Sequence, residues 1–123
     1  MFKQVCFFKK RPDMTMEQFI DYYEEKHASL LRELLPPMYI FRRNYLSFDD
    51  PMFAFDGRGG SGDDLDFDVI TEVVFSTREE AEALMAVVAK PEVFAKIQAD
   101  EANFVEPGRA RSFVVQVRQS PIP

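Results

Sequence analysis

The sequence predicts one α+β domain whose strands and helices follow the order β-α-β-β-α-β. Runs of aromatic and β-branched residues with period-two alternation mark four strands. Two capping-box sequences, beginning at Thr15 and Thr77, mark the starts of two helical regions. This order is that of the split-βαβ, ferredoxin-like pattern, with a four-stranded antiparallel sheet. The 123 residues suffice for one domain and not for two, so we expect a single domain over residues 1–123.

The first half of the chain supplies a strand, a helix and a second strand. Residues 2–9 form the first predicted strand, which ends at the charged stretch before Pro12. A helix follows over residues 15–35 and is stopped by Pro36 and Pro37. Its apolar stripe carries these residues at helical spacing: Phe19, Tyr23, His27, Leu30 and Leu34. Residues 38–48 form the second predicted strand.

The second half repeats the pattern after a long loop over residues 49–66. Residues 67–75 form the third predicted strand, with Val69 and Thr71 on one face and Asp68 and Glu72 on the other. A helix from Thr77 and a further helical segment from Pro91 to about residue 101 follow, since proline suits a first helical turn. The last predicted strand, residues 110–118, comes after Pro107-Gly108.

Composition excludes several classes of function. The net charge of −6 disfavours nucleic acid and anionic membranes as partners. No run approaches the ~20 apolar residues of a membrane span, and the N-terminal apolar run is too short for a signal peptide, so we expect a cytoplasmic protein. The lone cysteine, Cys6, is expected to pack as a small hydrophobe. Thirteen phenylalanines are many for one small core and indicate a ligand pocket or a subunit interface.

The stretch GRGGSG, residues 57–62, matches the G-x-G-x-x-G pattern of dinucleotide-binding loops. That motif works between a strand and a helix, whereas here the glycines precede a strand. Asp56, Asp63, Asp64 and Asp66 surround the glycines and would repel a pyrophosphate. We therefore predict a flexible acidic insertion over residues 49–66, which is either a lid over a pocket or a subunit contact.

His27 is the only histidine, which rules out a metal site built on several histidines. A single histidine on an apolar helix stripe is often a satisfied core residue. Burial beside an acid would instead shift its pKa and suit it to proton transfer. His27 is therefore the first candidate catalytic residue, and no metal site is expected.

Asp68 and Glu72 are two acids on one face of a presumptive central strand, where an acid must be paired or hydrated. One reading pairs Arg42 or Arg43 with these acids across the strands. The other reading is a pocket that combines Asp68, Glu72, Arg42 and Asn44, roofed by the helix of His27. The sequence does not fix the strand register that decides between them.

Asp100 and Glu101 end the second helical region, where acids oppose the helix dipole and so indicate a tertiary role. Asp100 and Phe104 are further candidates for closing a pocket. No Ser-His-Asp arrangement and no motif for flavin, haem or pyridoxal phosphate is present. An enzyme with this sequence would be cofactor-free and would handle a small apolar molecule.

Four segments together resemble the EthD family, within the dimeric α+β-barrel superfamily. They are FFKKRPDMTMEQFIDYYEEKHA, YIFRRNYL, DFDVITEVVFST and ADEANFVEP, which span most of residues 2–117. The resemblance implies a ferredoxin-like protomer whose sheet packs against that of a second copy, and a pocket between sheet and helices. Family relatives include proteins of ether-degradation gene clusters and cyclases, decarboxylases or dehydratases of polyketide-type aromatic compounds.

The first hypothesis is a cofactor-free enzyme that acts on a hydrophobic, aromatic or polyketide-like compound by general acid–base chemistry. His27, Asp68 and Glu72 would be catalytic, and the substrate would be bound by Tyr23, Arg42, Asn44, Asp100 and Phe104. A cofactor-independent monooxygenase, or an accessory protein of a degradation pathway, is the second hypothesis. A non-enzymatic module that binds a small molecule is the third.

Overall fold

The computed structural model describes residues 1–38, 40–60 and 64–122. Position 39 of the predicted second strand and positions 61–63 of the predicted insertion lie outside the described residues. The predicted α+β, ferredoxin-like fold is confirmed. Its four strands are β1 (Phe2–Lys10), β2 (Ile40–Tyr45), β3 (Val69–Phe75) and β4 (Val105–Val115). They form one antiparallel sheet in the order β2-β3-β1-β4.

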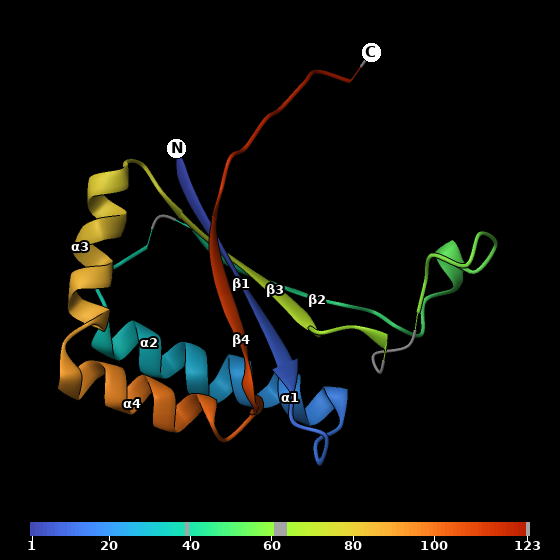
Figure 1. The fold of residues 1–123 in the computed structure, drawn as a ribbon, viewed down its shortest axis with the longest axis horizontal. Helices are drawn as coiled ribbons and strands as arrows, with labels where there is room; N and C mark the ends of the chain where they lie inside the picture. Colours follow the sequence, from blue (N-terminus) through green and yellow to red (C-terminus); the bar gives the residue numbers. More distant parts are fainter. Residues whose placement is uncertain (39, 61–63, 123) are drawn as a thin grey trace.

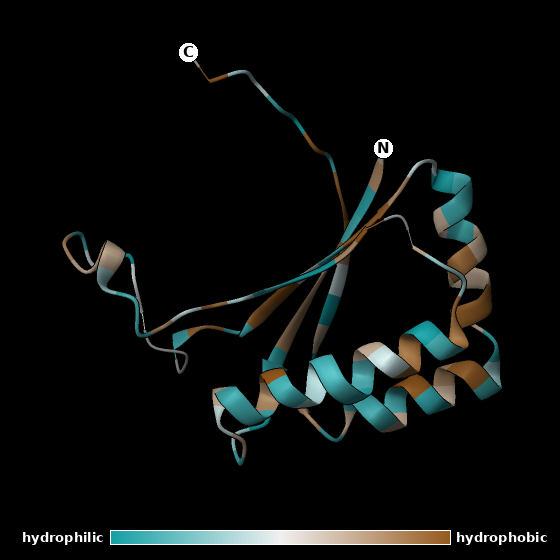
Figure 2. Cartoon of the chain, turned by 180° about the vertical axis from the view of Figure 1, so that it is seen from behind, coloured by the Kyte–Doolittle hydropathy of each residue, from teal (hydrophilic) through white to brown (hydrophobic). Residues whose placement is uncertain are grey.

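The helical segments lie on one side of this sheet (Figure 1). They are α1 (Met16–Tyr22), η1 (Tyr23–His27), α2 (Ala28–Leu34), α3 (Arg78–Val88) and α4 (Pro91–Glu101). In Figure 2 these helices carry alternating hydrophilic and hydrophobic bands, as helices that bury one side do. The other face of the sheet has no element of the described chain packed over it (Figures 1 and 2).

The predicted helix starts follow their capping residues. Thr15 and Gln18 form the complete capping box, with the Thr15 hydroxyl accepting from the Gln18 N–H and the Gln18 side chain accepting from the Thr15 N–H. At the second start, Thr77 accepts from the Glu80 N–H, but the Glu80 carboxylate accepts from the N–H of Ser76 instead. Both arrangements use side chains to satisfy backbone groups that a helix start leaves free.

The helix predicted over residues 15–35 is interrupted by a π-helical turn, η1, which no pattern in the sequence predicts. A π-turn holds more residues than an α-turn and therefore shifts the phase of the downstream helical face. Residues at a spacing of four then fall on one side, and Tyr23, His27, Leu31 and Leu35 all face the sheet. Leu30 and Leu34 of the predicted stripe are half-buried, as Leu31 and Leu35 are, but unlike these two they do not line the cavity described below.

The last strand begins earlier than predicted. Pro107-Gly108 does not precede β4 but lies within it, where the pairing with β1 shifts between Phe8 and Lys10. Gly108 has a φ of 77°, which a glycine adopts without steric cost. A β-bulge of this kind inserts extra residues into one strand and bends it without ending the pairing.

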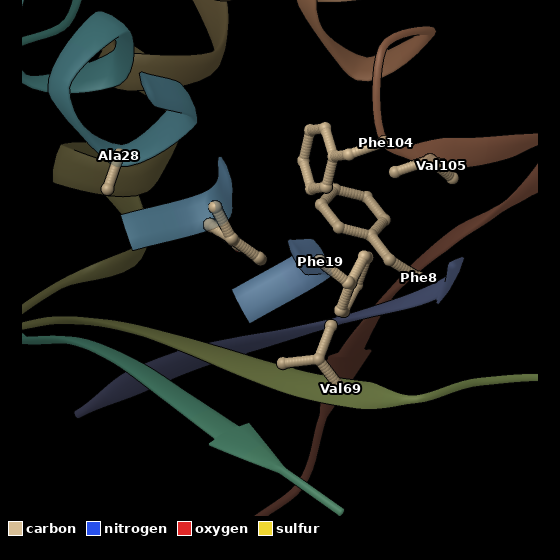
Figure 3. Packing of buried hydrophobic residues seen from close by; sticks show 7 residues of the cluster. Phe8, Phe19, Ala28, Val69, Phe104 and Val105 are labelled. Carbon is tan, nitrogen blue, oxygen red and sulfur yellow. The ribbon is translucent and has the colours of Figure 1, made fainter. Parts of the chain in front are cut away.

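The main core lies between the sheet and the helices α1 and η1, as the close view of Figure 3 shows. Phe8 of β1, Phe19 of α1 and Phe104, which directly precedes β4, meet there, with ring centroids of Phe19 and Phe104 5.6 Å apart. A second cluster, around Phe75, Ala81 and Leu84, joins α3 to the same face of the sheet. The two clusters flank the space described below.

The segment between β2 and β3 projects away from the body, at the end of the sheet opposite α3 (Figure 1, green). It carries the short 3₁₀ turn η2 (Pro51–Phe53), which Asp50 caps by accepting from the Met52 N–H. In the order of elements, η2 is followed by β3. Within the described chain, no helix is long and apolar enough to cross a membrane.

Replacing Phe19 by Ala is expected to lower the free energy of unfolding by about 3–5 kcal/mol, because a fully buried ring is removed from the core. Denaturant unfolding at fixed protein concentration measures the change. Phe55→Ala is the matched control, since Phe55 is 82% exposed and its loss should cost less than about 0.5 kcal/mol. Equal losses for both variants would contradict the described packing.

Candidate active site

A cavity of about 260 Å³ lies between the helices and the covered face of the sheet. Most of its wall is apolar and comes from both layers. Phe8 and Val73 belong to the sheet, and Leu31, Leu84 and Val88 to the helices. Its polar groups are few, and they come from β1, η1, β3, α4 and β4: Gln4, Cys6, Tyr23, His27, Thr71, Glu101 and Ser112. An apolar pocket with a few convergent polar groups is the usual form of a small-molecule site.

His27 lies at the end of the π-turn, with only 1% of its surface exposed, and forms part of the cavity wall. Its Nδ1 lies 2.8 Å from Oδ2 of Asp100 on α4. A carboxylate only accepts hydrogen bonds, so Nδ1 carries the proton in the neutral ring and Nε2 has the free lone pair. No described residue forms a hydrogen bond with Nε2.

Three aromatic rings enclose the imidazole. The Phe104 ring centroid lies 4.9 Å from that of His27, and the centroids of Tyr23 and Phe8 lie at 5.5 Å and 6.1 Å. Burial among these rings lowers the pKa of His27 below 6.5, because it disfavours the charged ring, and the Asp100 carboxylate partly opposes the effect. The imidazole is therefore neutral at neutral pH and able to accept a proton.

Asp100 is itself held in place by a second hydrogen bond. The Tyr22 hydroxyl donates to Oδ1 of Asp100 at 2.7 Å, and Asn103 Nδ2 donates to the Tyr22 hydroxyl oxygen at 2.8 Å. The hydrogen bonds therefore run from Asn103 through Tyr22 and Asp100 to His27. They fix which carboxylate oxygen meets the ring and which tautomer the ring adopts.

Glu101, the next residue of α4, contributes to the cavity wall. Burial, with a smaller contribution from the neighbouring Asp100 carboxylate, raises the pKa of Glu101 to about 7. No described residue forms a hydrogen bond with its carboxyl group. The cavity thus holds a carboxyl group that carries a proton for part of the time at neutral pH, beside a neutral imidazole.

The sheet supplies hydroxyl and thiol groups to the same cavity. The hydroxyls of Tyr23 and Thr71 are 2.7 Å apart, and burial raises the pKa of Tyr23. Burial also raises the pKa of Cys6 to about 11, an effect that the adjacent Ser112 partly offsets. These groups are therefore neutral at physiological pH. They can donate or accept hydrogen bonds but do not act as nucleophilic anions.

Asp68 does not line this cavity, and its predicted convergence with His27 is not observed. Its side chain is 1% exposed and accepts a hydrogen bond from the Lys10 N–H at 2.8 Å. Lys9 Nζ lies 3.6 Å from the same carboxylate. Asp68 directly precedes β3, where it ties the start of that strand to β1.

Glu72, Arg42 and Asn44 share the uncovered face of the sheet, with the sheet between them and His27. Glu72 is ion-paired with Lys3, lies 3.5 Å from Arg42 Nη1, and accepts from Asn44 Nδ2 at 3.0 Å. Lys3, followed by Asn44, lowers the pKa of Glu72. Arg42 and Glu72 are thus paired across neighbouring strands, as one of the two hypotheses for these acids predicted. The other hypothesis, in which the helix of His27 covers a pocket formed by these residues, is wrong. The helices cover the face of Thr71 instead.

The remaining predicted site residues lie around His27, though in different roles. Tyr23 borders the cavity as predicted. Asp100 and Phe104 lie behind the imidazole and do not line the cavity, so they position the ring. The candidate list omitted Glu101, Thr71 and Cys6. The signal for Glu101 was its place beside Asp100 at a helix C-terminus, where an acid is locally unfavourable.

Asp100→Asn is expected to lower the midpoint of the His27 titration by about one pH unit, because the carboxylate that favours the charged ring is removed. NMR of the imidazole measures this without ambiguity, since the chain has a single histidine. Asp21→Asn, at an exposed position of α1, is the matched control and should leave the midpoint in place. A midpoint that rises in Asp100→Asn would contradict the assigned pair.

Glu101→Gln is expected to remove a pH dependence of stability. The pKa of Glu101 is raised from 4.5 to about 7, so its contribution is fully present below pH 4.5 and is lost as pH rises through 7. The unfolding free energy of the wild type, minus that of Glu101→Gln, should fall by up to about 3 kcal/mol between pH 4.5 and 8.

Denaturant unfolding of both proteins across this pH range gives the difference. The lowered pKa of His27 acts in the opposite sense, with stability lost as pH falls, but it is common to both proteins and cancels. Glu92→Gln, at an exposed position of the same helix, controls for the substitution itself. A difference that stays constant with pH would show that the Glu101 carboxyl is solvated.

Comparison with known proteins finds solved structures with the same fold. An EthD family protein from Bacillus halodurans superposes with a TM-score of 0.60 and 18% identity over 96% of this chain and all of that one. A hydroxynitrile lyase from Passiflora edulis gives 0.56 and 11%, covering 97% of this chain and 96% of that one. A dimeric ferredoxin-like protein of unknown function from Bacteroides fragilis gives 0.53 and 12%, covering 94% and 95%.

At these identities the structural likeness establishes the fold alone. No curated protein matches the sequence. The EthD domain model, however, matches residues 11–108, which include both helical regions and every polar group assigned to the cavity except Gln4, Cys6 and Ser112. The chain therefore belongs to the EthD domain family.

Proposed function

We propose that this protein is a small cofactor-free enzyme that moves protons on a hydrophobic, aromatic-type molecule by general acid–base chemistry. One observation carries the proposal: the His27 imidazole, held by Asp100, and the Glu101 carboxyl line the same apolar cavity. Their surroundings push the pKa of the acid up and that of the base down. Two titratable groups tuned apart in this way are typical of an acid–base pair.

His27 is the proposed base. Its ring is neutral near pH 7, and with Nδ1 committed to Asp100 it accepts a proton at Nε2. Asp100 then stabilises the imidazolium that forms, as the aspartate of a hydrolase triad does. Tyr22 and Asn103 keep Asp100 in the orientation that this requires.

Glu101 is the proposed acid. With a pKa of about 7, its carboxyl is protonated in a large fraction of molecules at neutral pH. It can then donate a proton to a carbonyl or leaving-group oxygen of a bound molecule. The hydroxyls of Tyr23 and Thr71 form a second polar point in the wall where such an oxygen can be held.

The size and lining of the cavity support an aromatic ligand. A cavity of about 150 Å³ lined by apolar side chains is known to admit benzene, and this one measures about 260 Å³. Phe8 and Phe41 contribute aromatic surface. The hydroxynitrile lyase named above has the same fold, so a lyase reaction is compatible with this architecture.

The uncovered face of the sheet is the proposed contact for a second copy of the chain. Val5, Phe7 and Ile70 are apolar residues of this face that are only half-buried in the protomer. Pairing of two such faces would cover them, and the ferredoxin-like protein from Bacteroides fragilis is a dimer. Each protomer would keep its own cavity on the opposite side of its sheet.

Hydrogen–deuterium exchange in a model ketone tests the proposed chemistry without knowledge of the natural substrate. In D₂O, 2-acetylnaphthalene should exchange its methyl hydrogens faster with the protein present, because His27 removes a C–H proton while Glu101 protonates the carbonyl oxygen. ¹H NMR follows the loss of the methyl signal. His27→Gln is expected to reduce the catalysed rate by about 100-fold or more, and Glu101→Gln by a smaller factor.

Glu79→Gln, at an exposed position of α3, is the control for the effect of substitution in general and should exchange at the wild-type rate. Binding of the ketone is measured separately by titration. If the wild type binds the ketone but does not speed its exchange, the protein is a binding module and the enzymatic proposal is wrong. Exchange that persists in His27→Gln would assign the base to another residue.

A further inference from the structure

The cavity wall carries no cation among the residues that the structure describes there. Its only groups that gain or lose charge near neutral pH are His27 and Glu101. The neighbouring cations form ion pairs outside the cavity. Lys3 pairs with Glu72 on the uncovered face of the sheet, and Lys9 pairs with Asp68, just before β3. Arg43 pairs with Glu24 at 2.6 Å. None of these three cations contributes to the cavity lining.

Negative charge at the cavity comes from Asp100 and Glu101, whereas Arg43, the cation that acts on Tyr23 in the wall, is ion-paired with Glu24. Asp100, directly behind the imidazole, is a carboxylate whose hydrogen bonds come from Tyr22 and His27. Glu101 interacts electrostatically with Asp100 on its own helix, Cys6 on β1 and Tyr23 on η1. No cation is among the groups that shift the pKa of Glu101. A bound anion would therefore meet an uncompensated negative field in an apolar enclosure, where an unpaired charge is costly.

We propose that this cavity selects uncharged ligands and rejects carboxylates, so that the substrate is a neutral carbonyl- or hydroxyl-bearing aromatic molecule. The inference rests on the proposed function and narrows it. Proton abstraction beside a carbonyl, dehydration, cyclisation and isomerisation all suit a neutral substrate. A decarboxylation that begins from a bound carboxylate anion is disfavoured at this site. A carboxylated precursor has to lose or mask its acid group in an earlier reaction before it enters this site.

Matched ligands of one shape but different charge test the selection. 2-Acetylnaphthalene and 2-naphthoate differ only in a methyl group replaced by a charged oxygen, and methyl 2-naphthoate restores the neutral form of the acid. Titrations followed by the His27 ring signals at pH 8 give the three dissociation constants. The wild type is expected to bind both neutral ligands, and to bind 2-naphthoate roughly 100-fold more weakly.

Two variants test whether the negative charge of the cavity wall causes the weak binding of 2-naphthoate. Glu101→Gln should narrow the gap between the ketone and the carboxylate, because it removes one negative group. Met85→Lys should narrow it further, because Met85 borders the cavity while remaining 45% exposed, so a lysine there can keep its amine hydrated and still face a bound anion. Met85→Gln is the matched neutral control and should keep the wild-type preference.

Binding of 2-naphthoate as tight as that of the ketone would overturn the inference, as would a preference that neither Glu101→Gln nor Met85→Lys alters. These outcomes are distinct from failure of the proposed function. A protein that selects the neutral ketone but does not catalyse its exchange would keep the inference about charge and lose the enzymatic proposal. A protein that catalyses hydrogen exchange in the ketone and also binds 2-naphthoate tightly would support the enzymatic proposal and contradict the inference about charge.

Discussion

The hydrogen bond between His27 and Asp100 is the constraint on which the rest of the site depends. It joins the π-turn to the end of α4, two segments more than 70 positions apart in the chain. A buried imidazole without this partner would have no defined tautomer and no group to stabilise its charged form. Phe8, Tyr23 and Phe104 around the ring make the bond stronger by excluding water, and the same exclusion is what lowers the pKa of the imidazole.

Acids on the two sides of the sheet have pKa values shifted in opposite directions. On the uncovered face, Glu72 has Lys3, Arg42 and Asn44 as partners and is held as a carboxylate. On the covered side, Glu101 has no such partner, and its proton is retained to a higher pH. The contrast follows from ordinary electrostatics, because burial favours the neutral form of an acid and a nearby cation favours its charged form. A paired acid serves structure, whereas an unpaired one remains available for proton transfer.

Periodicity and capping residues made the order and approximate bounds of the strands and helices predictable from the sequence. The same periodicity predicted that His27 lies on the buried side of its helix. The sheet face that the helices cover was not predictable, because alternation divides a strand into two faces without saying which one is covered. Both faces of β3 contain apolar residues. The acids Asp68 and Glu72 suggested a polar pocket on their own face of the strand, whereas the cavity lies on the face of Thr71. The partnership of His27 with Asp100 was equally out of reach, since it joins segments whose proximity arises only from the tertiary fold.

The π-turn between Tyr23 and His27 makes the length of this helical region as important as its composition. The turn absorbs one residue beyond those an α-turn would hold, and so sets the rotation of everything that follows it. A residue lost elsewhere in the helix would turn Leu31 and Leu35 away from the sheet, whereas a residue lost within the π-turn is absorbed because the turn then closes as an α-turn. The π-turn is therefore the point in this helical region where the chain length can change by one residue while both walls of the binding chamber keep their positions.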